Sequence, residues 1–125
     1  MNYSMQPLFG LRTEELDIIR GILETAGPEL ERVAVFGSRA QGNYRPNSDL
    51  DLVLYGPLDE KSADRLWTLF QESPLPFSVD VKRYSAIVYL PLRQHIDQVA
   101  KPLFVHSAEG WVAEHDPDAA GAYHD

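Results

Sequence analysis

Hydrophobic residues recur along this chain with two different periods, and each period predicts one kind of element. Over residues 14–25 they return every three or four positions, which is typical of a helix with one buried face. Over 32–36 both alternating sets of positions are apolar, which is typical of a strand covered on two sides. Over 77–82 apolar and polar residues alternate, which indicates a half-buried strand. Along the whole chain the pattern predicts helix 14–25, strand 32–36, short helix 38–42, strand 49–55, a helix after Asp59, strand 77–82, a helix from Pro91 and strand 102–105.

Capping residues and prolines place the ends of these elements. Thr13 is expected to cap the first helix, Ser38 the short one and Asp59 the third. The buried face of the third helix is expected to comprise Ala63, Leu66, Trp67 and Phe70. Because proline cannot donate to a strand ladder, the run at 102–105, which begins with proline, is predicted to be a short edge strand.

The alternation of helices and strands predicts an α/β (α+β) fold, a small mixed β-sheet with helices packed against it. A chain of 125 residues has room for one domain, which we place at residues 1–106. Residues 107–125 are rich in Ala, Asp, Glu and His, and we expect an acidic C-terminal tail without regular structure there.

Charge and cysteine content narrow the classes of function. The chain has 19 acidic and 11 basic residues and a formal net charge of −8, so direct nucleic-acid binding is disfavoured. It contains no cysteine, which excludes disulfides, thiolate zinc sites and cysteine nucleophiles. We find no signal peptide and no apolar run long enough to span a membrane, so we expect a cytoplasmic protein.

Two aspartates stand at the start of the predicted strand 49–55. Asp49 and Asp51 are two positions apart, so their side chains leave the same face, with about 6.5 Å between the Cα atoms. Two carboxylates about 4 Å apart repel by about 4 kcal/mol at an effective dielectric near 20. A divalent cation with a preference for oxygen ligands, Mg²⁺ or Mn²⁺, would relieve this repulsion.

A Gly-Ser turn precedes these aspartates by ten residues. Gly37 lets the backbone come close to a ligand, and Ser38 adds a hydroxyl donor. Arg39 is a candidate fork for phosphate oxygens. An anion cradle beside a metal-binding carboxylate pair is what a metal–triphosphate complex requires.

Asp80 lies on the polar face of the predicted strand 77–82. If this strand pairs beside strand 49–55, Asp80 converges with Asp49 and Asp51. Three carboxylates can hold two metal ions about 3.5–4 Å apart, as in enzymes that displace a group at phosphorus. An exposed strand residue without function is the alternative interpretation of Asp80.

Gly37-Ser38, the spacer and Asp49-x-Asp51 resemble the signature of the DNA polymerase β-type nucleotidyltransferase superfamily, and the chain is similar to its minimal nucleotidyltransferases from prokaryotes. The resemblance covers about residues 12–105. It implies the nucleotidyltransferase fold, ATP as substrate and two Mg²⁺ ions, with Mn²⁺ as an alternative. By position, it makes Asp49 and Asp51 metal ligands and Asp80 a ligand, a proton acceptor or both, while Gly37 and Ser38 hold the β- and γ-phosphates.

The resemblance also implies a partner. Minimal nucleotidyltransferases are usually encoded beside a small helical protein of the HEPN type, and several pairs are toxin–antitoxin systems. In these pairs the nucleotidyltransferase adenylylates a tyrosine of the partner. The leading hypothesis is therefore transfer of AMP from ATP to a tyrosine of a HEPN-type toxin, for which this chain is the antitoxin.

This chain departs from the pattern of the family at two positions. Gln41 stands where relatives often carry Lys or Arg, which would weaken phosphate affinity, and Ala100 stands where a glycine often ends the last helix. Two alternative functions are open at this stage. One is nucleotidyl transfer to a small-molecule hydroxyl. The other is a non-catalytic protein that masks its partner by contact alone.

Overall fold

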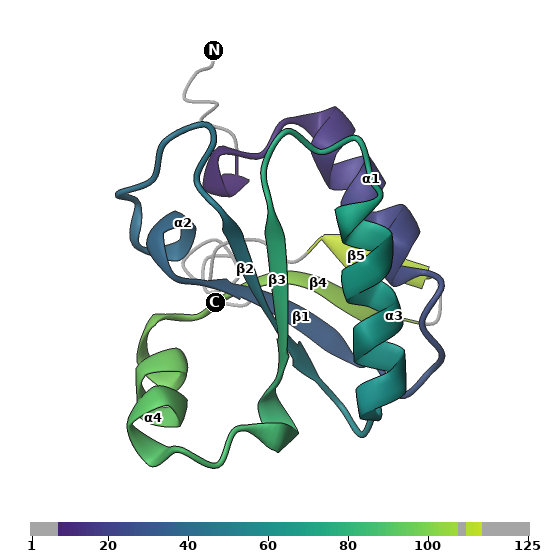
Figure 1. The fold of residues 1–125 in the computed structure, drawn as a ribbon, viewed down its shortest axis with the longest axis vertical. Coiled ribbons are helices and arrows are strands. Elements are labelled where there is room, and N and C mark those ends of the chain that lie inside the picture. Colours follow the sequence, from purple (N-terminus) through teal and green to yellow (C-terminus); the bar gives the residue numbers. More distant parts are fainter. Residues whose placement is uncertain (1–7, 108–109, 114–125) are drawn as a thin grey trace, which may run out of the picture.

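Five strands form one mixed sheet in the computed structural model, which describes residues 8–107 and 110–113 (Figure 1). In sequence order the strands are β1 Arg32–Phe36, β2 Leu50–Tyr55, β3 Val79–Arg83, β4 Lys101–Ser107 and β5 Gly110–Ala113. Their order in the sheet is β3-β2-β1-β4-β5. The β2–β3 pair is parallel and the other three pairs are antiparallel.

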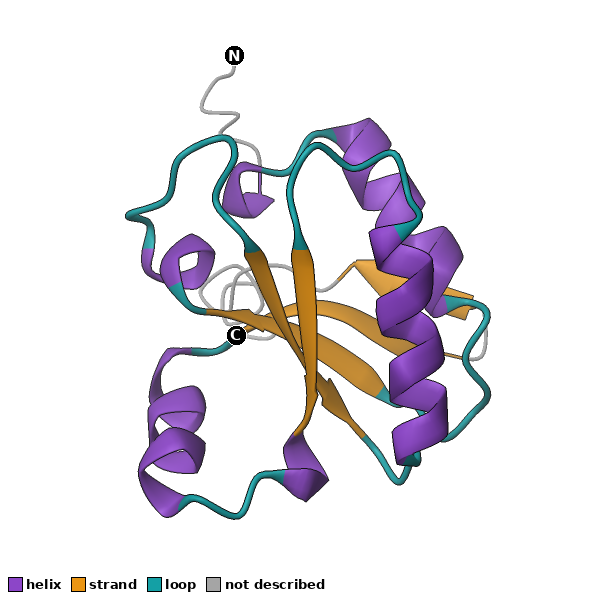
Figure 2. Cartoon of the chain, viewed as in Figure 1, coloured by secondary structure: helices purple, strands orange, loops and turns teal. Residues whose placement is uncertain are grey.

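Helices lie on both faces of this sheet, so the expected fold class is confirmed (Figure 2). The α-helices are α1 Thr13–Leu23, α2 Ser38–Gln41, α3 Glu60–Gln71 and α4 Leu90–Val99, and there are two short 3₁₀ turns, η1 Leu8–Gly10 and η2 Tyr84–Ala86. All the helices and strands that the hydrophobic pattern predicted are present. In the described part of the chain, no helix has the length and apolarity needed to cross a bilayer.

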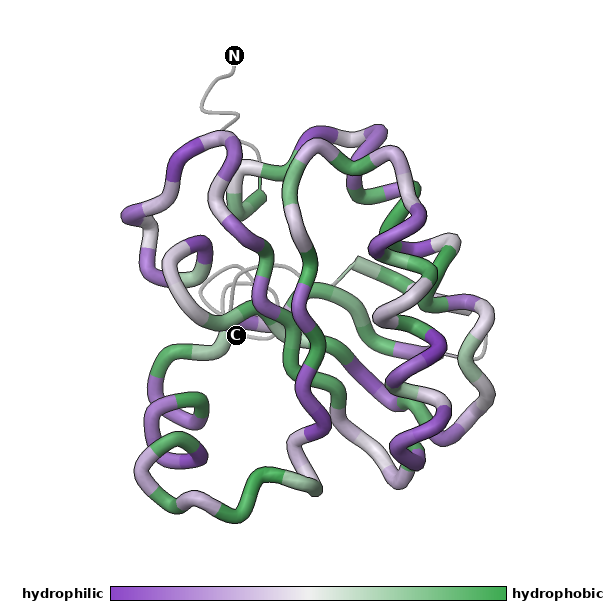
Figure 3. The backbone as a smooth tube through the Cα atoms, in the orientation of Figure 1, coloured by the Kyte–Doolittle hydropathy of each residue, from purple (hydrophilic) through white to green (hydrophobic). Residues whose placement is uncertain are grey.

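Side chains of one strand alternate between two cores, because successive residues of a strand point to opposite faces. Val33 and Val35 of β1 join the main core beneath α1 and α3, whereas Ala34 and Phe36 join a smaller core beneath α4. The strands are largely hydrophobic and the loop at 43–49 is hydrophilic in Figure 3. Asp51, Asp80 and Lys82 emerge on this α4 face. Asp51 lies two positions before Val53 of the smaller core, and Asp80 and Lys82 are the register partners of these two residues.

Strand β4 corrects the expectation of an edge strand at 102–105. It lies inside the sheet, between β1 and β5. Pro102 is tolerated because the ladder is irregular at that point, with a register shift between Val33 and Ala34 opposite it. The two edges of the sheet are β3 and β5, and β5 lies in the segment 107–125, for which no structure was expected.

Strand β5 pairs with β4 and adds one aromatic side chain to the main core. Trp111 is buried in the main core and stacks on the ring of His106, with 4.8 Å between the ring centroids. The sheet therefore continues beyond residue 106, and a boundary placed there cuts through a paired hairpin. The rest of the expected tail, 108–109 and 114–125, lies outside the described residues.

Three local expectations about helices also change. Ser38 is the first residue of α2, and Gly37 is its N-cap; Thr13 likewise begins α1 after Arg12 as N-cap. Asp59 caps α3 as expected, with its Oδ1 accepting from the Ser62 amide at 2.8 Å. Trp67 is 46% exposed, because it lies about 100° around the helix from Leu66, outside the buried face.

Candidate active site

The turn between β1 and α2 requires a glycine. Gly37 has φ 76° and ψ −156°, a backbone conformation that residues with a side chain rarely adopt. A Cβ atom at this position would also collide with the Oδ2 atom of Asp51. Glycine therefore does two things here: it makes the turn possible, and it lets the backbone lie directly against a carboxylate.

Parallel pairing of β2 and β3 places two of the predicted carboxylates opposite each other. Asp51 is the register partner of Asp80. The backbone bond from the Leu50 amide to the Ser78 carbonyl, at 2.9 Å, fixes this register where the two strands begin. Asp49 is exposed and directly precedes β2. The condition set by the sequence, that the strand bearing Asp80 pairs beside the strand bearing Asp51, is met.

Asp51 lies in a strongly anionic environment. Its pKa is raised above the ordinary value of an aspartate, first by burial and then by the negative charges of Asp80 and Asp49. Lys82 opposes this shift, and its Nζ lies 3.6 Å from Oδ2 of Asp80. Because the Lys82–Asp80 pair is about half exposed, it neutralises little of the charge. The site has an excess of negative charge that a cation would compensate.

The donor set fits a magnesium or manganese ion. All three side chains offer carboxylate oxygens, the ligands that these ions prefer. Within residues 8–107 and 110–113, no three Asp, Glu or His side chains are gathered closely enough to enclose a metal ion. The carboxylates of Asp49, Asp51 and Asp80 are thus electrostatic neighbours rather than a closed ligand cluster.

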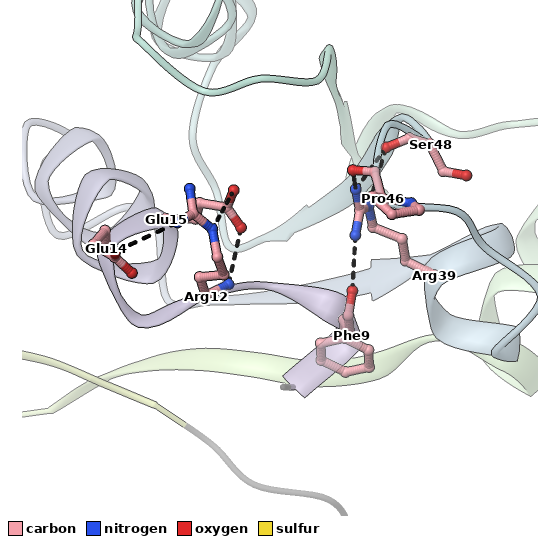
Figure 4. Close-up of polar contacts among 7 residues, drawn as sticks. All are labelled: Phe9, Arg12, Glu14, Glu15, Arg39, Pro46 and Ser48. Atoms are coloured by element: carbon pink, nitrogen blue, oxygen red, sulfur yellow. Dashed lines mark hydrogen bonds and ion pairs between the residues drawn. The ribbon is translucent and has the colours of Figure 1, made fainter. Parts of the chain in front are cut away.

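The structure corrects the expectation that Arg39 binds phosphate (Figure 4). Its side chain is 1% exposed, and its guanidinium donates to three backbone carbonyl oxygens. Nε and Nη2 reach the Ser48 carbonyl at 3.1 and 2.8 Å, Nη2 also reaches the Pro46 carbonyl at 3.1 Å, and Nη1 reaches the Phe9 carbonyl at 2.9 Å. Because Nε, Nη1 and Nη2 all donate to backbone carbonyls, the guanidinium cannot bind a phosphate with two parallel hydrogen bonds.

Arg39 instead fixes the segments that precede Asp49 and Asp80. It holds the carbonyl of Ser48, the residue before Asp49, and its guanidinium carbon lies 4.4 Å from the centroid of the Phe77 ring, just before β3. It thereby joins α2 to the segments that lead into β2 and β3. The local sequence does not reveal this role, because the bound carbonyls come from positions 7, 9 and 30 residues away.

Neither departure from the family pattern disturbs the local structure. Gln41 is exposed at the end of α2. Ala100 ends α4 in an extended conformation, with φ −67° and ψ 140°, which any residue adopts without strain. Glycine is therefore not needed at this helix end.

Comparison with known proteins agrees with this geometry. A family model described as nucleotidyltransferase domain matches residues 16–104. A probable protein adenylyltransferase, MntA of Haemophilus influenzae, is 35% identical over 104 residues, which are 74% of this chain and 90% of that protein. The family resemblance drawn from the Gly-Ser turn and the paired aspartates is confirmed.

Solved structures agree as well. A crystal structure of a toxin–antitoxin with AMP-PNP has a TM-score of 0.56 and 27% identity, covering 70% of each chain. A mutant of the MntA–HpeT toxin–antitoxin has a TM-score of 0.56 and 26% identity, covering 74% of this chain and 73% of that one. The chain belongs to the nucleotidyltransferase domain family and is a nucleotidyltransferase similar to MntA.

Proposed function

We propose that this chain transfers AMP from ATP to a tyrosine hydroxyl of a helical HEPN-type partner, and that this modification is how it acts as an antitoxin. The observation that carries the proposal is the placement of the Gly37 turn against Asp51, directly opposite Asp80. Support for a protein acceptor comes from the name of the MntA relative, a probable protein adenylyltransferase. The toxin–antitoxin with AMP-PNP supports an adenine nucleotide and a partner protein.

In this proposal the three aspartates would hold two Mg²⁺ ions, or Mn²⁺, together with the triphosphate, whose oxygens would complete the ligand set. When bound, such ions lower the pKa of an attacking hydroxyl and compensate the charge of the phosphates. Asp49 and Asp51 act as ligands. Asp80 acts as a ligand, and its carboxylate accepts the proton of the tyrosine hydroxyl. Support for a cation comes from the pKa of Asp51, which is raised first by burial and then by the negative charges of Asp80 and Asp49.

The Gly37-Ser38 turn holds the β- and γ-phosphates in this proposal. The phenolic oxygen forms a bond to the α-phosphorus, and the bond from the α-phosphorus to the bridging oxygen breaks. AMP is then esterified to tyrosine, and pyrophosphate leaves. Positioning is the main contribution of the protein, because the turn and the two strands fix donor and acceptor relative to each other. ATP and the partner would meet the chain in the cytoplasm.

A transfer assay tests the proposal. ATP labelled at the α-phosphate is incubated with Mg²⁺, the purified chain and the HEPN-type protein encoded beside it, and we expect label on one tyrosine of that protein. Replacement of that tyrosine by phenylalanine should abolish labelling. The double variant Asp49→Asn/Asp51→Asn should label less than about 1% as fast, since charge compensation in the transition state is lost.

Asp64→Asn is the matched control, because Asp64 is an exposed carboxylate on α3, on the other face of the sheet. It should label at the wild-type rate. Label on small hydroxyl compounds but never on the partner would favour a small-molecule acceptor. If the double variant neutralises the partner as completely as the wild type, masking by contact is the mechanism and the proposal is wrong.

A further inference from the structure

Three consecutive apolar residues project into solvent where η2 leads into α4. Val88 is 88% exposed, Tyr89 67% and Leu90 62%. In Figure 3 the loop between η2 and α4 is largely hydrophobic. Single exposed apolar residues are ordinary, but a contiguous group is typical of a surface that another molecule covers.

A hollow of about 340 Å³ accompanies these residues. It is lined by Lys82, Arg83, Ala86, Ile87, Val88, Tyr89 and Leu92. We call these residues, together with the exposed Leu90 beside them, the 82–92 surface. Both charged residues of the lining are basic, although the chain as a whole carries a formal charge of −8. Lys82 is ion-paired with Asp80, whereas Arg83 donates to a neutral group, the Leu58 carbonyl at 3.3 Å, and keeps its positive charge. The hollow is thus an apolar patch with a positive rim on an acidic protein. Its complement is an apolar side chain flanked by carboxylates.

The 82–92 surface adjoins the candidate active site. Lys82 lines the hollow, and its Nζ lies 3.6 Å from Oδ2 of Asp80. A polypeptide segment seated in the hollow therefore lies one side chain away from this carboxylate. Asp80 belongs to β3, which is the edge strand of the sheet, so no further strand separates the hollow from solvent. This is the arrangement that a protein acceptor needs if it is to be held while its hydroxyl approaches Asp80.

We propose that the 82–92 surface docks the acceptor protein through an apolar side chain flanked by carboxylates on that protein. The identity of the acceptor as the HEPN-type partner rests on the proposed function; the location and chemistry of the surface do not. A small hydroxylated substrate would gain nothing from apolar residues that project beyond the hollow. The surface gives the enzyme its preference for a protein acceptor.

Binding of the partner tests this proposal separately from catalysis. Dissociation constants are measured by calorimetry with the HEPN-type partner and no ATP. The variant Val88→Ser/Leu90→Ser should bind about thirtyfold more weakly or worse, as expected when two central apolar contacts of an interface are lost. Arg83→Gln should flatten the dependence of the dissociation constant on salt concentration, because it removes a charge at the rim.

Trp67→Ser is the matched control. It removes another exposed large apolar side chain, but from α3 on the opposite face, and should change the dissociation constant less than about twofold. Equal losses for Trp67→Ser and the double variant would overturn the proposal, as would unchanged binding of the double variant. Failure of the wild-type chain to bind this partner would also overturn it.

Two further outcomes separate this proposal from the proposed function. Partner binding that depends on Val88 and Leu90, without any transfer of AMP, would contradict the proposed function alone. Concentration-dependent dimerisation of the wild-type chain, lost in the double variant, would assign the surface to a second copy of this chain and overturn the acceptor proposal. Circular dichroism and thermal melting of each variant establish that the exposed substitutions leave the fold intact.

Discussion

The two faces of the sheet differ in how completely they are covered. Among the described residues, nineteen buried apolar side chains pack into the core beneath α1 and α3, but only five form the core beneath α4. The same strand supplies both: Leu52 of β2 is fully buried under the helices, and its neighbour Asp51 is partly buried on the α4 face. Stability resides mainly on the face beneath α1 and α3, which we call the closed face. Chemistry requires the α4 face, which we call the open face.

The difference follows from what each face must accommodate. Carboxylates that act on a nucleotide have to be reachable, and an unbroken apolar core over them would leave no room for it. Apolar burial is also the main stabilising contribution in a domain of this size. We therefore expect substitutions on the two faces to have separable effects on transfer rate and on unfolding free energy.

The largest effect is expected for Asp51→Asn, a substitution on the open face. Burial and the charges of Asp80 and Asp49 raise the pKa of Asp51, so the fold disfavours its charged form, and a neutral Asn should leave the unfolding free energy the same or increase it slightly. The rate of AMP transfer should fall by roughly a thousandfold, because the proposed function makes Asp51 a metal ligand. Labelling kinetics and chemical denaturation measure the two effects. Transfer above about a tenth of the wild-type rate would break the assignment of chemistry to this face.

Leu52→Ala is the corresponding test of the closed face. The side chain is fully buried in the main core, so the truncation should cost about 2–5 kcal/mol of unfolding free energy. Transfer per folded molecule should change little, provided that the assay temperature keeps the variant folded. A specific loss of transfer without loss of stability would show that the two faces are not separable in this way.

Arg39 contacts both the main core, through Phe77, and the segment before Asp49, through the Ser48 carbonyl, so its substitution should show both effects. Arg39→Met leaves the carbonyls of Phe9, Pro46 and Ser48 without their buried donor, and should cost about 2–4 kcal/mol of unfolding free energy. Arg39→Lys keeps the charge but cannot reproduce the fork, so it should recover only part of this loss.

The binding of AMP-PNP with Mn²⁺, measured by calorimetry below the melting temperature of each variant, distinguishes positioning from stability alone. If Arg39 positions the segment before Asp49, binding should weaken in Arg39→Met, and Arg39→Lys should lie between it and the wild type. Wild-type affinity in a destabilised Arg39→Met variant would reduce the role of Arg39 to stability.

The smallest loss of stability is expected for Asp59→Ala, at the start of α3 on the closed face. The pKa of Asp59 is lowered by the hydrogen bond from the Ser62 amide at the start of α3. The folded-state pKa is thus below the unfolded one, so this cap stabilises the protein above the unfolded pKa and the contribution is lost as the pH falls through the folded pKa. Asp59→Ala should lower the melting temperature slightly at pH 7 and not at all in strong acid, with transfer unchanged. An equal decrease at both pH values would refute the capping explanation.

Much of the site could be predicted from the sequence, because its features depend on residues that are close together along the chain. The Gly37 turn follows from a glycine at a break after an apolar run, and the common face of Asp49 and Asp51 follows from the period of a strand. The pairing of Asp51 with Asp80 could be stated only as a condition, since periodicity does not say which strands are neighbours. The role of Arg39 was predicted wrongly, because an exposed fork and a buried one have the same local sequence.

Taken alone, the sequence determined the order and type of the elements, because alternation and helical spacing record which side chains must be buried. It also determined the family, because a glycine turn and a carboxylate pair at that spacing meet a specific chemical need. Tertiary structure decided what depends on contacts distant in sequence: the interior position of β4, the addition of β5 through Trp111, the exposure of Trp67 and the burial of Arg39. Strand order and the partners of a long side chain depend on the packing of whole elements, which a local pattern does not encode.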